Sequence, residues 1–140
     1  MVWTYDPGQV SVSVGDFDIT GFQPGTMVTV ERDERMFTKQ MGTQGEGTRS
    51  KSNDRSGRIT IMLMQTSPSN AILSSLAALD EYGNAGLVNA QVKDASGKSI
   101  YQAETAWIEG YPNAEYANEA GPREWVIVSD KITMFEGGNA

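Results

Sequence analysis

A stretch of seventeen residues without a single apolar side chain, GTQGEGTRSKSNDRSGR at positions 42–58, restricts the fold of this chain more than any other feature. It is followed directly by ITIMLMQT, which is nearly all apolar. A segment that buries no apolar surface gains nothing to offset the backbone entropy that it loses on becoming ordered. The stretch therefore lies outside any hydrophobic core, which the rest of the chain has to supply.

The rest of the chain predicts a mainly β fold. Apolar and polar residues alternate with the two-residue period of half-buried strands in QVSVSVG, DFDITGF and RITIMLMQT. Further strands are expected in GLVNAQVKD, SIYQAETAWIEG and EWVIVSDKITMFEG, the last as one strand or as two with a bulge near Ser129 and Asp130. An extended segment from Val28 to about Met41 is joined to the strand near Ile59 through the polar stretch, which predicts a long hairpin arm over about 41–59.

One helix is expected over about residues 68–82. The apolar residues of SPSNAILSSLAALDEYGN follow the spacing of a single buried stripe, and Gly83 is a typical helix stop. This helix is expected to cover an open face or edge of the sheet. A chain of 140 residues without an internal repeat predicts one domain, 1–140.

Several kinds of catalytic and metal site are excluded by composition. Cysteine and histidine are both absent, which rules out disulfides, thiolate nucleophiles, Cys/His zinc sites and Ser-His-Asp triads. The adjacent acids Asp33/Glu34 and Asp80/Glu81 lack the partners of an acid–base pair. We therefore expect that the chain is not an enzyme and that it needs no cofactor.

Two short motifs match ligand sites only in part. DFDITG opens like a calcium loop with Asp16 and Asp18, but Met27 occupies the twelfth position, where such a loop needs a bidentate Glu. GTQGEGTRSK is glycine-rich beside Lys51, but it leads into a strand, whereas a phosphate-binding P-loop opens a helix. We expect neither a metal site nor a nucleotide site.

The net charge of −7 is unevenly distributed. Residues 32–58 hold seven basic and four acidic side chains, which gives +3, whereas residues 80–140 hold four basic and ten acidic ones, which gives −6. Tight DNA binding needs a net basic face, so this asymmetry suits self-association better. The alternative is that both regions are only solvated faces.

Residues of the polar stretch are candidates for a subunit interface. The glycines allow the arm to bend, and the cations offer donors to carboxylates of another subunit; these residues are Gly42, Gly45, Gly47, Arg49, Lys51, Arg55 and Arg58. A flexible, solvated loop is the alternative. The aromatic residues Trp3, Trp107, Trp125, Tyr5, Tyr101 and Tyr111 either belong to the core or stack on sugars or nucleobases, as they would in a monomeric ligand-binding β-sandwich.

Three segments of the chain carry a resemblance to a known family, which are VWTYDPGQVSVSVGDFDITGF, NDRSGRITIMLMQTSPSNAILSSL and WVIVSDKITMFEGG. In these segments the chain resembles the tail tube proteins of contractile-tailed bacteriophages. The resemblance runs from Trp3 to Gly138 and is most specific from Asn53 to Leu76. It implies a β-sandwich or half-barrel with one flanking helix. Six copies would form a ring with one continuous β-barrel, and the rings would stack into a tube inside a contractile sheath. The arm would then become ordered against a neighbouring copy.

The resemblance also implies partners and a location. Besides further copies of the chain, the partners would be the tail sheath, baseplate and tail terminator proteins, with double-stranded DNA passing through the lumen without specific binding. Acids in or beside strands are candidates for the lumen wall: Asp16, Asp18, Glu31, Glu104 and Glu109. No apolar run has the length of a membrane span. We expect a virion protein without a membrane anchor, assembled in the bacterial cytoplasm, or else the inner tube of a secretion-like or bacteriocin machine.

Overall fold

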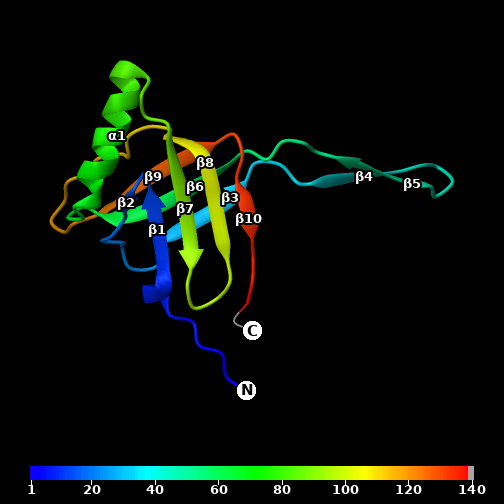
Figure 1. The fold of residues 1–140 in the computed structure, drawn as a ribbon, viewed down its shortest axis with the longest axis horizontal. Coiled ribbons are helices and arrows are strands. Elements are labelled where there is room, and N and C mark those ends of the chain that lie inside the picture. The colour runs from blue at the N-terminus through cyan, green and yellow to red at the C-terminus, as the bar shows by residue number, and fades with distance from the viewer. Residues whose placement is uncertain (139–140) are drawn as a thin grey trace.

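A computed structural model describes residues 1–138 (Figure 1). Its elements follow one another as η1 (Pro7–Gln9), β1 (Val10–Val14), β2 (Phe17–Asp18), β3 (Val28–Arg32), β4 (Phe37–Met41), β5 (Gly47–Lys51), β6 (Gly57–Met64), α1 (Ser69–Gly83), β7 (Val88–Asp94), β8 (Ile100–Ile108), β9 (Pro122–Ser129) and β10 (Thr133–Phe135). All strands except β4 and β5 belong to one antiparallel sheet in the order β2-β1-β7-β8-β9-β6-β3, with β10 also paired to β8. Over residues 1–138 the protein is therefore mainly β with one α-helix, as the sequence predicts.

The long strand β8 divides the sheet into two layers. On the edge away from β7, Ile100–Gln102 pair with β10, whereas Ala106–Ile108 pair with β9. The register against β7 slips between these two parts, because Val88 faces Ala106 but Ala90 faces Ala103. A bulge of this kind bends a strand and increases its twist. Figure 1 shows the result: β1, β7 and β8 cross over β9, β6 and β3.

The hydrophobic core lies between the two layers. Alternate residues of each layer are buried, including Val12 and Val14 of β1 and Ile59, Ile61 and Leu63 of β6. The period-two pattern of the sequence is thereby confirmed for both strands. Core residues contributed by the other elements are Ile19, Leu73, Ala77, Ala90, Val92, Ala103, Ala106, Ile108, Trp125, Ile127 and Ile132.

Helix α1 covers one end of the sandwich (Figure 1) and spans Ser69–Gly83, against an expected range of about 68–82. Leu73 and Ala77 point into the core. The helix ends at Asn84, whose left-handed φ of 52° lets its amide bond back to the carbonyl of Asp80. In the part of the chain that the structure describes, no helix has the length and hydrophobicity needed to cross a membrane.

The hairpin arm is a separate two-stranded sheet, in which β4 pairs with β5 (Figure 1). The predicted extended segment is interrupted by bends between Arg32 and Phe37, so the arm begins before residue 41. Gly47–Lys51, inside the polar stretch, already forms a strand within one chain. The segment itself has no apolar side chain, and backbone hydrogen bonds to β4 with a turn at Gly45, where φ is 93°, hold it in this strand. Both arm strands are exposed throughout.

We predict that Gly57→Ala destabilises the body where the arm leaves it. A Cβ on Gly57 would overlap the carbonyl oxygen of Glu31 and lie 2.9 Å from Cδ1 of Ile132. Overpacking of this kind costs about 1–3 kcal/mol in the free energy of unfolding, measurable by urea denaturation. Gly110→Ala is the matched control, because a Cβ there meets nothing within 4 Å. Equal unfolding midpoints for the two variants would contradict the packing at this junction.

Candidate assembly surfaces

The arm carries a basic and apolar face. Residues directly opposite each other in an antiparallel pair lie on the same face, and the register pairs Phe37 with Lys51, Lys39 with Arg49, and Met41 with Gly47. The Arg49 guanidinium carbon lies 4.3 Å from the centroid of the Phe37 ring, in agreement with this register. We call the side chains of Phe37, Lys39, Met41, Arg49 and Lys51 the basic arm face.

The opposite face of the arm is neutral. It carries only hydroxyl and amide side chains, from Thr38, Gln40, Thr48 and Ser50. At the tip, the Gly42 amide donates to the Glu46 carbonyl at 2.7 Å, and the Gly45 amide donates to the Gly42 carbonyl at 3.1 Å. The charge of the two paired strands is therefore concentrated on one side.

Two of the four predicted interface cations lie away from the basic arm face. Arg58 is on β6, where its guanidinium forms ion pairs with Glu31 at 3.6 Å and Asp33 at 3.5 Å. Arg55 stands at the base of the arm, where its carbonyl accepts a hydrogen bond from the Ile132 amide at 2.9 Å. Lys39, which was not among the predicted residues, joins Arg49 and Lys51. Its place in the strand register is the signal that identifies it.

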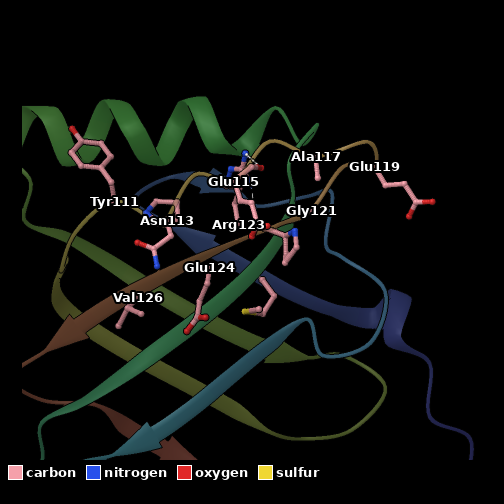
Figure 2. Close-up of a pocket in the computed structure, with 12 residues that line it drawn as sticks. Tyr111, Asn113, Glu115, Ala117, Glu119, Gly121, Arg123, Glu124 and Val126 are labelled. Carbon is pink, nitrogen blue, oxygen red and sulfur yellow. Dashed lines mark hydrogen bonds between the residues drawn. The ribbon is translucent and has the colours of Figure 1, made fainter.

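A pocket with a volume of about 530 Å³ lies beside the loop that joins β8 to β9 (Figure 2). Three carboxylates line it, with Glu115 and Glu119 on the loop and Glu124 on β9. Met62 of β6 and Val126 of β9 supply apolar atoms to its wall. We call this site the acidic pocket.

Buried contacts hold the loop and strand that form the acidic pocket. Arg123 is only 8% exposed, and its guanidinium donates to the carbonyls of Pro122 at 3.1 Å and Glu115 at 3.5 Å. Its guanidinium carbon also lies 5.5 Å from the Tyr116 ring centroid. Arg123 is thus held within the wall of the pocket, and with three carboxylates and this one guanidinium the described lining remains net acidic.

The SPSN segment anchors the same region. The Asn70 amide nitrogen donates to the carbonyls of Met64 and Ser67, and its Oδ1 accepts from the Trp125 indole nitrogen at 2.9 Å. Trp125 also packs edge-to-face against Tyr111, with 6.2 Å between ring centroids. Desolvation, together with the nearby Glu81 carboxylate, raises the pKa of Tyr111.

The predicted lumen residues do not form one cluster. All five are exposed, but Asp16 and Asp18 belong to the β1–β2 hairpin, and Glu31 lies on the β3 edge, paired with Arg58. Glu104 lies at the β8 bulge, and Glu109 follows β8. Among residues 1–138, no group of three or more acidic side chains has the arrangement of a metal site. The aromatic candidates are also dispersed, from buried Trp125 to exposed Trp3 and Tyr5.

A family model described as bacteriophage PhiTE tail tube protein matches residues 6–137. The chain belongs to this tail tube protein family. A structural protein of Pseudomonas phage KPP10, ORF10, is 33% identical over 144 aligned residues, which cover 97% of this chain and 83% of that protein. The predicted resemblance is therefore confirmed, and this tail tube protein is a phage structural protein by family.

Solved structures from contractile systems share the fold of this tail tube protein. The cap that terminates the anti-feeding prophage tube aligns with a TM-score of 0.67 at 10% identity, covering 96% of this chain and 93% of that one. A sheath/tube terminator of an extracellular contractile injection system aligns with a TM-score of 0.64 at 15% identity, and the alignment covers 96% of this chain and 99% of that one. A chain of the sheath–tube complex of such a system aligns at 0.62 and 16% identity, covering 95% and 92%.

We predict that Asn70→Ala destabilises the tail tube protein by about 1–3 kcal/mol, because it leaves the buried Trp125 indole nitrogen without its acceptor and removes the side-chain donor from the Met64 carbonyl. Urea unfolding followed by tryptophan fluorescence measures the loss. Ser75→Ala is the control, since its hydroxyl bonds only to the Ala71 carbonyl on the exposed helix surface. If both variants unfold at the wild-type urea concentration, Asn70 does not anchor this region.

Proposed function

We propose that this tail tube protein forms hexameric rings that stack into a hollow tube, and that this tube conducts the viral genome into the host. The family match over residues 6–137 carries the proposal. The open sheet and the projecting arm of the single chain support it, because both leave exposed backbone amide and carbonyl groups with which a neighbouring copy can form hydrogen bonds.

Ring formation has a physical basis in the edges of the sheet. The strand path ends at β2 and at β3, and β3 pairs on one side only, with β6. An exposed edge strand presents unpaired amide and carbonyl groups, and joining edges around a closed barrel removes them. Hydrogen bonding between the sheets of adjacent subunits would thus favour a ring.

The arm supplies the second contact between subunits. Its strands pair only with each other and bury no residue. A two-stranded hairpin by itself is marginally stable in water, so packing against a neighbouring copy would stabilise it. The predicted interface residues Gly42, Gly45, Gly47, Arg49 and Lys51 belong to this contact, with Arg55 and Arg58 at its base.

The electrostatics suit a channel for DNA. A protein with a net charge of −7 repels the phosphates of a passing duplex. Acids of the tube wall would come from among Asp16, Asp18, Glu31, Glu104 and Glu109. The role is mechanical and electrostatic rather than enzymatic. Sheath, baseplate and terminator proteins are the expected partners in the virion tail, and the likeness to tube caps and to a sheath–tube complex supports them.

The second candidate is the inner tube of an injection machine that carries protein or no cargo. This tail tube protein shares its fold with chains of an extracellular contractile injection system, which favours the second candidate. Purified particles discriminate the two functions, because a genome tube occurs with a DNA-filled capsid and an injection machine does not.

We predict that replacing residues 37–51 with a short glycine-containing turn leaves the body folded and stops tube formation. The body core contains no residue of this segment, so its circular dichroism and melting temperature should stay close to those of the wild type. Electron microscopy and sedimentation of the concentrated protein measure assembly. Tubes at wild-type yield from the shortened chain would show that the arm has no role in assembly.

A further inference from the structure

The basic arm face and the acidic pocket are complementary in charge and in apolar character. The arm face presents three cations, Lys39, Arg49 and Lys51. Glu115, Glu119 and Glu124 line the pocket together with Arg123, which leaves it net acidic, and Figure 2 shows the Glu119 side chain extending outward from the loop. Both surfaces also contain apolar groups, which would exclude water from the ion pairs: Phe37 and Met41 on the arm, and Met62 and Val126 in the pocket.

The two surfaces lie at opposite ends of the molecule. Figure 1 shows the arm at one end of the long axis, and α1 with the β8–β9 loop at the other. The arm therefore points away from the pocket of its own chain. We propose that the basic arm face of one tail tube protein docks in the acidic pocket of the next copy. This proposal rests on the proposed function, because it assigns the contact that joins one subunit to another.

The composition of the arm favours a second copy over DNA as its occupant. Residues 33–56 carry five basic and four acidic side chains, so the whole arm is nearly neutral. DNA binding draws its affinity from many released counterions, whereas three cations beside Phe37 match a small acidic pocket with apolar walls. The counterpart is present on every copy.

Such a contact propagates itself. Each copy carries the basic arm face and the acidic pocket on different surfaces, so every docked copy leaves its own arm face or its own acidic pocket available. Head-to-tail contacts of this type close into rings or extend into filaments, depending on the rotation between copies. The neutral arm face stays outside the contact and faces solvent.

Charge exchange tests the pairing. Variant A carries Lys39→Glu, Arg49→Glu and Lys51→Glu, and variant B carries Glu115→Lys, Glu119→Lys and Glu124→Lys. Each variant alone brings like charges together and should lose about tenfold or more of its pelletable assembly. An equimolar mixture of A and B pairs opposite charges wherever A and B alternate, and a chain with all six changes pairs them at every contact, so both should recover most of the yield. Circular dichroism checks that both variants fold.

The controls separate this pairing from assembly in general. Thr38→Glu with Thr48→Glu places acids on the neutral face and should leave assembly within about twofold, because that face makes no ion pair. Wild-type protein that forms no rings or filaments overturns the proposed function and the pairing together. Wild-type assembly without rescue by the mixture or the six-change chain overturns the pairing alone. Loss of binding to a DNA duplex in variant A, with assembly unchanged, also overturns it.

Discussion

Packing of the two layers against each other holds the body together, and it uses only one face of each strand. Ile61 and Leu63 of β6 and Ile127 of β9 lie on that inner face and are essentially inaccessible to solvent. Because the sheet folds over itself at the β8 bulge, the chain encloses this core without joining its first and last strands. The body thus has a core of its own, while its sheet edges and arm extend beyond that core.

The base of the arm is fixed although the arm strands are exposed. The Arg32 guanidinium donates to the Ile132 carbonyl at 2.6 Å, and Arg58 bridges Glu31 and Asp33. Hydrogen bonds from Ser56 lower the pKa of Asp54, which keeps this carboxylate charged and bonded in the returning segment. A fixed base reduces the orientational freedom lost when the arm binds, so it favours association.

The sequence predicts the strands and the helix well where burial follows a local pattern. Alternation identifies the inner faces of β1 and β6, and the suggested break near Ser129 and Asp130 separates β9 from β10. The sequence does not show that the chain leaves the sheet after Arg32, because the residues on either side of this point, in β3 and in β4, are both extended. Lys39 and the acidic pocket also escape sequence analysis, because they depend on strand register and on a loop packed against β6 and β9.

The central claim is that the hydrophobic core of the body is complete in one chain, whereas the arm is completed by a neighbour. Hydrogen–deuterium exchange of the amides in β4 and β5, compared between monomer and assembled tube, tests it most directly. The account predicts rapid exchange of these amides in the monomer and strong protection in the tube, with the β6 and β9 amides protected in both. Arm amides that exchange equally fast in the tube, or that are already protected as strongly in the monomer, would contradict it.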